Sequence, residues 1–468
     1  MAYQSPFSTR YGSPEMRAIW SEVAKRRAWR SVWAAVAEAQ SAADLISPEQ
    51  LNEIRAQVDA IDLTRAYEIE AEIGHDLMAE LRTYAEQCPS GGAILHWGLT
   101  SADIQDNADV MRQKAALALV LDRLRTLLLT FAERIEETHD LPVMGFTHLQ
   151  PAEPTTLGYR LSIYAQDLLE GFEGLLSLHR RLRGKGIRGP VGTSGPFVDM
   201  LADSDLTPEI LESNVMNALN LEAFPVTTQT YPRMQDFRLL SGLVDVAGAL
   251  HKFAFDLRLL QSPGIGGLQE PMGEKQVGSS AMPFKRNPVA AEKICSLARE
   301  TAAWMSVAWQ NGATSLLERT LDDSANRRSM IPEAFLACDE MLLNASQILQ
   351  GLVIDRDHFQ SQLKRFGPFA AIERVLTALV QAGADRQEMH ERLRQHSMSA
   401  WETYQNKGKN PLKGLLSKDT VLLKHLQPAR IRKLLDASTY VGLAPVRAKE
   451  MAARIRGRLS PEQIEKDP

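Results

Sequence analysis

The amino-acid sequence predicts an all-α protein built around a bundle of long helices. Several long stretches of the 468-residue chain contain no proline, the residue that most strongly interrupts a helix interior. Within these stretches apolar residues recur every three or four positions, a spacing that places them on one face of a helix. Alternating runs rich in valine, isoleucine or threonine, which are typical of strands, are nearly absent.

The proline-free stretches define five predicted long helices. They lie between Pro89 and Pro142, Pro154 and Pro190, Pro232 and Pro263, Pro288 and Pro332, and Pro332 and Pro368. At a rise of about 1.5 Å per residue, such helices extend roughly 30–45 Å and need a long bundle to bury their apolar faces. The predicted buried faces of the first, second and fifth are Leu117, Leu121, Leu124, Leu128, Phe131 and Ile135; Leu157, Leu161, Tyr164, Leu168, Phe172 and Leu175; and Phe335, Cys338, Leu342, Ala345, Leu349 and Leu352.

The helix pattern divides the chain into three predicted domains. Residues 1–111 hold shorter helices and loops, residues 112–354 hold the long central helices, and residues 355–468 return to shorter segments. Long helices with wide apolar faces need partner chains to cover them, so we expect an oligomer.

The charge of the chain excludes one class of function. Lys and Arg number 53 and Asp and Glu 58, which gives a formal net charge of −5. Proteins that bind nucleic acid by neutralising phosphates are normally basic, so we expect no nucleic-acid partner. A few local arginines can still bind a small anionic ligand inside an acidic protein.

The cysteines and the apolar stretches indicate the compartment. Cys88, Cys295 and Cys338 show neither CxxC nor metal-ligand spacing, and their odd number argues against a disulfide framework. The N-terminal segment lacks the apolar core of a secretory signal, and no run of about 18 apolar residues occurs. We therefore expect a soluble cytoplasmic protein with no membrane partner and no metal or organic cofactor.

One segment, residues 262–288, resists the helical pattern. It is rich in glycine and proline, and its second half crowds Ser279, Ser280, Lys285, Arg286 and Asn287 into nine residues. Hydrogen-bond donors and positively charged side chains at this density suit an anionic ligand. Loops of this length between helices are usually functional or disordered. We favour a mobile active-site lid over a plain connector.

Three histidines and one arginine-rich segment are further candidates. His75, His96 and His148 each stand at an expected helix–loop junction beside polar residues, although each taken singly is more often structural than catalytic. The segment 318–328, ERTLDDSANRR, either holds a phosphate or carboxylates through its arginines or forms a solvated surface helix. No histidine pair has the HxxxH spacing of a zinc site.

These motifs carry a resemblance. GSSAMPFKRNP at 278–288 resembles the signature loop of the fumarase/aspartase superfamily, and GFTHLQPAEPTT at 145–156 is similar to its second conserved region. STRYGSPEM (8–16), GHDLMAE (74–80), ILHWGLTSADIQDN (94–107) and ERTLDDSANRR (318–328) narrow the resemblance to the adenylosuccinate lyase family, and closest to its animal-type branch. YVGLAP at 440–445 extends it weakly to the C-terminal part. The implied fold is the three-domain, all-α fold of the superfamily with a long central helix bundle.

The resemblance implies β-elimination of fumarate from adenylosuccinate, giving AMP, and from its aminoimidazole carboxamide relative SAICAR, giving AICAR. Carried over by motif position, Ser279 is the general base and His148 the general acid, with Glu292 paired to His148. Lys285 and loop N–H groups are expected to stabilise the serine alkoxide, because a free serine is a weak base. Lys285 and Asn287 are also expected to bind the substrate carboxylates.

The resemblance also implies the binding residues and the assembly. Substrate contacts fall on Arg10, Tyr11, His75, Asp76, His96, Thr100, Ser101, Gln229, Asn287, Lys293, Arg319, Ser324 and Arg328. Because these positions are distributed along long rigid helices, we do not expect one chain to bring them together. The resemblance implies a homotetramer in which each active site draws on three chains.

The chain departs from the family pattern at five positions, which are Gly74, Glu153, Tyr159, Lys293 and Met234. None coincides with Ser279, His148 or Lys285, so the departures concern substrate affinity more than chemistry. Two alternatives stay open. Another fumarate-releasing lyase, such as argininosuccinate lyase or fumarase, does not need Arg10, Tyr11, Arg319 and Arg328; a non-enzymatic structural protein on the same fold does not need an intact base and acid.

Overall fold

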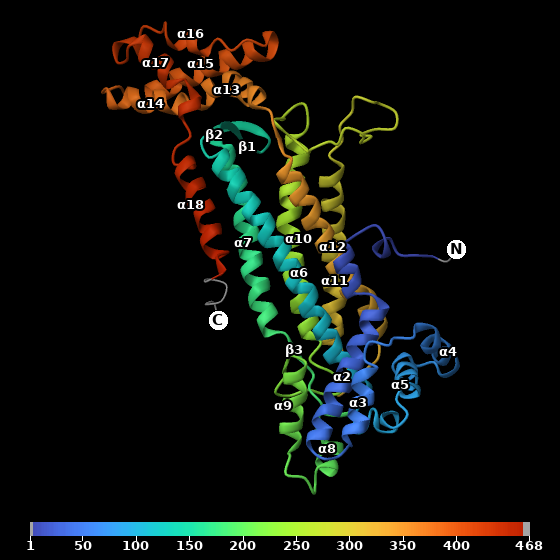
Figure 1. Ribbon diagram of the computed structural model, residues 1–468. Coiled ribbons are helices and arrows are strands. Elements are labelled where there is room, and N and C mark those ends of the chain that lie inside the picture. The colour runs from blue at the N-terminus through green and yellow to red at the C-terminus, as the bar shows by residue number, and fades with distance from the viewer. Residues whose placement is uncertain (1–2, 462–468) are drawn as a thin grey trace. The chain divides into compact units, whose positions relative to one another are not determined.

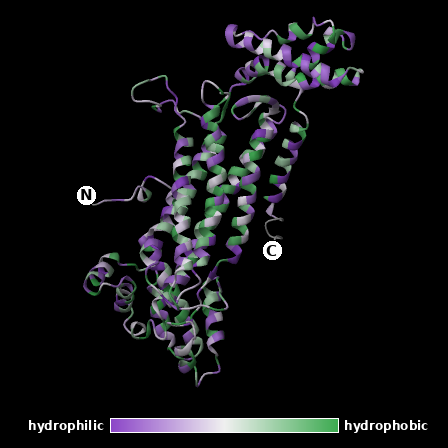
Figure 2. Cartoon of the chain, turned by 180° about the vertical axis from the view of Figure 1, so that it is seen from behind, coloured by the Kyte–Doolittle hydropathy of each residue, from purple (hydrophilic) through white to green (hydrophobic). Residues whose placement is uncertain are grey.

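The computed structural model describes residues 3–461 and is helical over most of their length (Figure 1), which confirms the predicted all-α class. The five longest helices of the described residues are α6 (Ser101–Glu137), α7 (Leu157–Arg181), α10 (Met234–Leu260), α11 (Val289–Ala313) and α12 (Ser324–Gln350). Hydrophobic and hydrophilic residues share the surface of each long helix (Figure 2), as expected of helices that bury one face.

Shorter helices precede and follow the long ones. Before α6 lie α1 (Pro14–Ile19), α2 (Glu22–Ala42), α3 (Pro48–Ala56), α4 (Leu63–Ile73) and α5 (Asp76–Glu86), and between α7 and α10 lie α8 (Gly195–Met200) and α9 (Pro208–Ala218). After α12 come α13 (Arg356–Ala370), α14 (Ile372–Gln381), α15 (Arg386–Lys407), α16 (Leu412–Leu416), α17 (Pro428–Leu434) and α18 (Ala444–Arg458).

The strands within residues 3–461 are short and form three pairs. β1 (Pro142–Thr147) and β2 (Gln150–Thr156) form an antiparallel hairpin with a bulge between Met144 and Phe146. The other pairs are β3 (Arg183–Gly184) with β4 (Glu222–Ala223), parallel, and β5 (Leu268–Gln269) with β6 (Val353–Ile354), antiparallel.

The predicted apolar faces are buried. Leu117, Leu124, Leu128, Phe131 and Ile135 of α6 are fully buried, and the predicted faces of α7 and α12 are buried as well. Phe253 of α10 meets Phe131 and Tyr164 edge to face at centroid distances of 5.4 and 5.5 Å. Burying a large apolar side chain contributes about 1.5–3 kcal/mol, so these contacts stabilise the helices far more than local propensity does.

Two prolines that were expected to mark helix boundaries lie inside helices. Pro332 lies within α12 and Pro368 within α13. A proline in a helix interior costs about 3 kcal/mol, because it removes one main-chain hydrogen bond and crowds the preceding turn. Met330, Ile331 and Phe335 around Pro332 are buried. Their burial offsets this cost, so the prediction that a helix begins after Pro332 is wrong.

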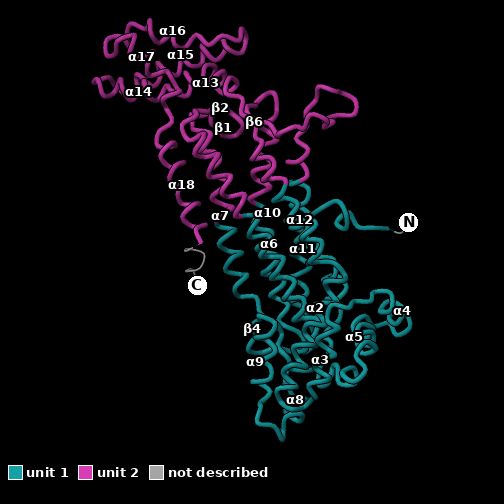
Figure 3. The backbone as a smooth tube through the Cα atoms, viewed as in Figure 1, with its two compact units in different colours: residues 1–124, 170–248, 294–343 teal, residues 125–169, 249–293, 344–468 magenta. Residues whose placement is uncertain are grey.

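The chain forms two compact units (Figure 3). The first consists of residues 1–124, 170–248 and 294–343, and the second of residues 125–169, 249–293 and 344–468. Each long helix therefore contributes one segment to each unit. The division into domains 1–111, 112–354 and 355–468 stays a prediction.

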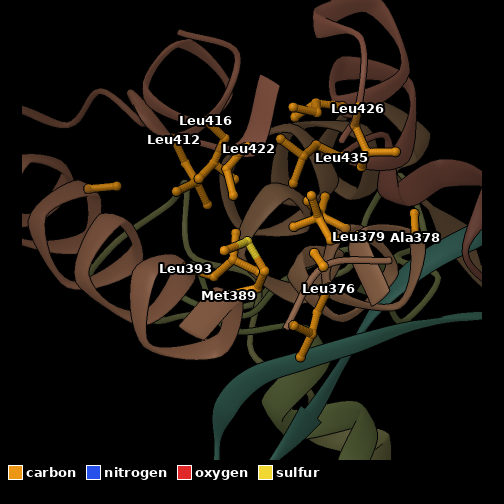
Figure 4. Close-up of a cluster of buried hydrophobic side chains, with 14 residues drawn as sticks. Leu376, Ala378, Leu379, Met389, Leu393, Leu412, Leu416, Leu422, Leu426 and Leu435 are labelled. Carbon is orange, nitrogen blue, oxygen red and sulfur yellow. The ribbon is translucent and has the colours of Figure 1, made fainter. Parts of the chain in front are cut away.

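The C-terminal helices have a core of their own within the second unit (Figure 4). Leu376 and Leu379 of α14 cluster with Met389 and Leu393 of α15, with leucines of α16 and with Ile431 of α17. Asp385 caps α15 by accepting a hydrogen bond of 2.8 Å from the N–H group of Glu388.

The structure also bears on the predicted absence of membrane spans and disulfides. Within residues 3–461, no helix combines the length and the apolar character needed to cross a membrane. Cys88, Cys295 and Cys338 are free and buried.

Candidate active site

The two units divide the predicted site residues between them. Most of the predicted binding residues lie in the first unit, and the residues predicted to carry the chemistry, including His148, Ser279 and Lys285, lie in the second.

The first unit contains a cavity of about 290 Å³ that brings four predicted residues together. Asp76 from the start of α5, Arg319 from the loop before α12, and Ser324 and Arg328 from the first turns of α12 all line it. The 318–328 segment is therefore neither a surface helix nor fully a loop, because α12 begins at Ser324 in its middle. The predicted anion-binding arginines face a concave site.

A buried ion network forms one wall of this cavity. The guanidinium of Arg233 binds both carboxylate oxygens of Asp106 at 2.9 and 3.0 Å and one oxygen of Asp323 at 2.6 Å. Asp323 in turn accepts a 3.0 Å hydrogen bond from Arg319. Burial acts to raise the pKa of Asp323, but Arg233 and Arg319 hold it below its usual value. Asp323 thus stays ionised and fixes the head group of Arg319.

Arg327 is held by a second group of buried side chains. It donates to Asp236 at 2.8 Å and to the hydroxyl of Tyr231 at 2.7 Å, and the same hydroxyl donates to Asp236 at 2.6 Å. Burial raises the pKa of Tyr231 well above its usual value, so the phenol remains a donor. Gln113 also donates to this hydroxyl, at 3.2 Å.

Several residues of this cavity were not predicted from the sequence. Arg233, Asp106, Asp109 and Gln113 all line it, and none was predicted. A signal was available in α6, where Gln105, Asp106, Asp109 and Gln113 form a polar stripe with spacings of one, three and four in a helix that otherwise buries apolar residues. Arg327, one of the arginines of the predicted 318–328 segment, also lines the cavity, with its guanidinium bound to Asp236 and Tyr231.

His75 and Asp76 begin α5. His75 is the N-cap residue, and its Nδ1 accepts a hydrogen bond of 3.4 Å from the N–H group of Met78. Asp76 binds Arg328 at 2.9 Å. Gly74 ends α4 in the left-handed conformation with φ of 67°, which a glycine adopts without strain. An arginine at this position would be strained, which gives the Gly74 departure a local structural reason.

Ser101 begins α6, and Thr100, the residue before it, is positioned by Asp103. Asp103 accepts hydrogen bonds from the main-chain N–H groups of Thr100 (2.8 Å), Arg188 (3.0 Å) and Gly189 (3.2 Å), and it pairs with the fully buried Lys185. Ala102, the next residue of the helix, lines the cavity.

The remaining predicted residues of the first unit do not line the cavity. The N–H groups of Arg10 and Tyr11 donate to the carbonyl of Pro6, in a segment that follows the short 3₁₀ turn Pro6–Ser8. The N–H group of Gln229 donates to the carbonyl of Glu318 at 3.2 Å, next to Arg319. His96 accepts a hydrogen bond of 3.1 Å from Trp33, and burial lowers its pKa. Their predicted binding roles stay predictions.

In the second unit, His148 occupies the turn of the β1–β2 hairpin. Thr147 pairs with Gln150, so His148 and Leu149 form a two-residue turn, and both have positive φ, 52° and 60°. Such turns favour asparagine and glycine, because other side chains are strained in this conformation. The turn holds the imidazole of His148 at the exposed tip of the hairpin.

A hollow of about 460 Å³ lies beside His148 and is formed within the second unit. Tyr159 and Arg160 of α7 and Lys252 and Asp256 of α10 line it. Asp256 accepts hydrogen bonds from Tyr164 (2.8 Å) and Lys252 (2.7 Å). The departure at Tyr159 therefore changes a residue beside the predicted acid. Glu153 of β2 accepts a hydrogen bond of 3.2 Å from Tyr440.

The segment 262–288 is only partly the loop that the sequence predicts. Its first half is anchored, since Leu268 and Gln269 form β5 and the carbonyl of Ile265 bonds to His358 at 2.8 Å. Its second half, from Pro271 to Pro288, has no helix or strand and is largely exposed. The structure therefore confines the candidate lid to the part that contains Ser279 and Lys285.

The predicted base lies in a tight turn of this lid. Oγ of Ser279 accepts hydrogen bonds from the N–H groups of Met282 (3.1 Å) and Ala281 (3.4 Å). Main-chain donors aimed at an oxygen stabilise negative charge there, as a serine alkoxide requires. Within residues 3–461, no hydrogen bond or ion pair joins Lys285 to Ser279 or Glu292 to His148. Glu292 and Lys293 lie in the first turn of α11.

The described part of the chain contains no cluster of three or more His, Cys, Asp or Glu side chains suited to a metal ion.

Comparison with known proteins identifies the family. A family described as lyase matches residues 9–301, and one described as adenylosuccinate lyase C-terminus matches residues 368–451. Adenylosuccinate lyase of Saccharomyces cerevisiae is 35% identical over 98% of this chain and 96% of its own length. This chain belongs to the adenylosuccinate lyase family. A relative of the same name from Schistosoma mansoni is 38% identical over 89% of this chain and 88% of its own length.

Solved structures confirm the fold. A 3-carboxy-cis,cis-muconate lactonizing enzyme from Pseudomonas putida superposes with a TM-score of 0.85 at 24% identity, covering 96% of this chain and 99% of its own. A fumarate lyase from Mesorhizobium sp. BNC1 superposes with a TM-score of 0.83 at 22% identity, covering 97% and 100%. The predicted fumarase/aspartase-type fold is confirmed, while the different names of these two proteins show that the fold alone does not select the reaction.

Proposed function

We propose that this chain catalyses β-elimination of fumarate from adenylosuccinate, giving AMP, and from SAICAR, giving AICAR. The observation that carries the proposal is the likeness to curated adenylosuccinate lyases over nearly the whole chain, at 35% identity to the yeast enzyme. The arginine-lined cavity of the first unit supports it, because both substrates are nucleotides with a phosphate group.

In the proposed reaction Ser279 acts as an alkoxide base. It removes a proton from the succinyl carbon next to a carboxylate, and the electrons of that C–H bond pass first onto the carboxylate. They then form the C=C bond of fumarate as the C–N bond breaks, and His148 gives a proton to the departing nitrogen. The two N–H groups that donate to Oγ of Ser279 lower the cost of the alkoxide.

Binding and charge stabilisation fall to the other predicted residues. Lys285 and Asn287 are proposed to hold the succinyl carboxylates on the lid. Arg319, Ser324 and Arg328 are proposed to hold the phosphate. Arg319 and Arg328 are paired with Asp323 and Asp76. A bound phosphate therefore has to compete with these carboxylates for the two guanidinium groups.

We further propose a homotetramer in which several chains complete each active site. Exposed apolar side chains on the long helices, Ile163 of α7, Phe255 of α10 and Trp309 of α11, suit a partner chain. The absence of a His148–Glu292 contact within residues 3–461 is consistent with pairing between chains. Light scattering of an active preparation tests this, because a monomeric mass contradicts it. The proposed compartment is the cytoplasm.

The test of the function is fumarate release from adenylosuccinate by the purified protein and by Ser279→Ala. We expect a loss of at least about 10³-fold in kcat for the variant, with substrate binding and assembly retained. Activity that survives in the variant contradicts the role of Ser279. An inactive wild-type protein contradicts the proposed function, and release of fumarate from argininosuccinate or malate would then identify another lyase.

A further inference from the structure

The exposed part of the lid, residues 271–286, begins and ends beside one side chain, that of Gln261. The amide oxygen Oε1 of Gln261 accepts a hydrogen bond of 2.9 Å from the N–H group of Glu270, and its Nε2 donates one of 3.0 Å to the carbonyl of Arg286. One amide therefore links the two ends of a segment of sixteen residues, counted from Pro271 to Arg286.

Gln261 is itself held by the helix that precedes it. It follows α10 directly, and its N–H group donates to the carbonyl of Leu257 at 2.8 Å, which continues the helical hydrogen-bond pattern. The side chain therefore projects from the rigid end of α10. Its two hydrogen bonds fix both ends of the lid relative to that helix end.

Glu270 ties the same lid end to α11. Its two carboxylate oxygens accept hydrogen bonds from the N–H groups of Ala290 (3.2 Å) and Ala291 (2.6 Å). These donors belong to the first turn of α11, where free N–H groups favour a carboxylate. The lid is thus joined at its base to the end of one long helix and to the start of the next.

Further contacts within the lid restrict the main chain next to Ser279, the predicted general base. Asn287 donates a hydrogen bond of 3.0 Å to the carbonyl of Gly278, the residue before Ser279. The carbonyl of Lys285 approaches Gly278 so closely that a Cβ at that position would lie 2.3 Å from it, so only glycine fits. Ser279 and Lys285 therefore lie in a loop that is closed at its ends, where Gln261 joins Glu270 to Arg286.

We propose that Gln261 is a positioning residue. It holds the two ends of the lid together and thereby fixes the orientation in which Ser279 is presented to the substrate. This inference rests on the proposed role of Ser279 and goes beyond it, because Gln261 touches neither the substrate nor the reacting atoms. An unclamped lid keeps its chemical groups but presents Ser279 in many orientations, and misplacement of a reacting group by about 1 Å can cost 10²-fold in rate.

The test compares Gln261→Met with Gln276→Met. Methionine matches glutamine in length and removes both hydrogen bonds. Gln276 lies in the exposed tip of the same lid, where its Oε1 accepts a local hydrogen bond of 3.2 Å from the N–H group of Gly273, so it is a matched control away from the base. Hydrogen exchange of peptides covering residues 271–288 and steady-state kinetics on adenylosuccinate are measured for both variants and for the wild type.

For Gln261→Met we expect kcat to fall about 10- to 100-fold while KM changes less than about threefold, with lid amides exchanging roughly tenfold faster. Gln276→Met is expected to match the wild type within about twofold in kcat. Wild-type exchange and kcat in Gln261→Met, or equal losses in both variants, overturn the proposal. If Gln261→Met does not fold, Gln261→Asn, whose shorter amide cannot span both partners, is judged by the same outcomes. The exchange measurement keeps its meaning even if the wild type releases no fumarate, so failure of the clamp and failure of the proposed reaction are distinguishable.

Discussion

Replacing Arg233 by methionine tests whether the buried ion network holds the cavity of the first unit together. Arg233 is 5% exposed, and its guanidinium makes three hydrogen bonds of 2.6 to 3.0 Å to Asp106 and Asp323. Methionine keeps most of the apolar stem but leaves two buried carboxylates without their shared partner. Removing one member of a buried ion pair typically costs about 3–5 kcal/mol, because the remaining charge stays desolvated.

The destabilisation caused by Arg233→Met is reduced by the hydrogen-bond donors that the two carboxylates keep. Asp323 keeps its 3.0 Å hydrogen bond from Arg319, and Asp106 keeps one of 2.8 Å from the N–H group of Tyr231. We therefore expect Arg233→Met to lower the free energy of unfolding of this unit by about 3 kcal/mol at pH 7, the lower end of that range. Urea unfolding, followed by the shift of the first transition midpoint, measures it. Arg238 is exposed and lies in α10, five positions after Arg233, and it supplies the control Arg238→Met, expected within about 0.5 kcal/mol of wild type.

The pH dependence of this difference adds a second check. The pKa of Asp323 is lowered in the folded protein, so the stability that its ionisation contributes is present above the unfolded pKa of about 4 and is lost as the pH falls through the folded pKa. Without Arg233 this contribution shrinks, so the gap between variant and wild type should narrow as the pH falls below about 4. A destabilisation below about 1 kcal/mol at pH 7, or a gap that widens in acid, refutes the reasoning.

Two further predictions follow from single contacts in the second unit. Leu149→Gly should raise the free energy of unfolding by about 0.5–1 kcal/mol, because Leu149 has φ of 60° and is 62% exposed, so glycine relieves strain with little loss of packing; destabilisation in urea unfolding would mean that a partner chain covers this side chain. Asp419→Asn should destabilise the C-terminal helices by about 1.5–3 kcal/mol at pH 7, because Asp419 accepts hydrogen bonds of 2.7 Å from Arg392 and 2.6 Å from His396. Burial acts to raise the pKa of Asp419, but these two partners hold it well below its usual range, so its contribution is present above pH of about 4 and declines in acid. Thermal unfolding at pH 7 and pH 3 should show the larger difference at pH 7, and an equal difference at both would contradict the assignment.

The predicted fold came from local patterns and is largely correct. The three-to-four residue spacing placed Leu117, Leu124 and Phe131 on one face of α6, and all three are fully buried. Periodicity identifies buried faces because each helix repeats its geometry along its own sequence. The β1–β2 hairpin escaped this reasoning, since its turn uses His148 and Leu149 in place of the usual asparagine and glycine.

The candidate site was predictable only where a short motif contained its residues. Arg319, Ser324 and Arg328 come from one segment, and the tertiary structure places all three around one cavity. Asp106 and Arg233 are 127 positions apart, so nothing in either local sequence indicates that they meet. Their pairing, like the bridge from Gln261 to Glu270 and Arg286, depends on how separate helices end and pack.

The sequence by itself determined the helical class, the apolar faces and the family motifs of this protein. Each of these features depends only on residues close together in the chain or on one repeating spacing of apolar residues. Only the tertiary structure decided which charged side chains share the cavity, where the lid is anchored, and that α12 continues through Pro332. The physical reason is that these features depend on contacts between distant segments, whose burial energy outweighs local preferences such as the proline penalty.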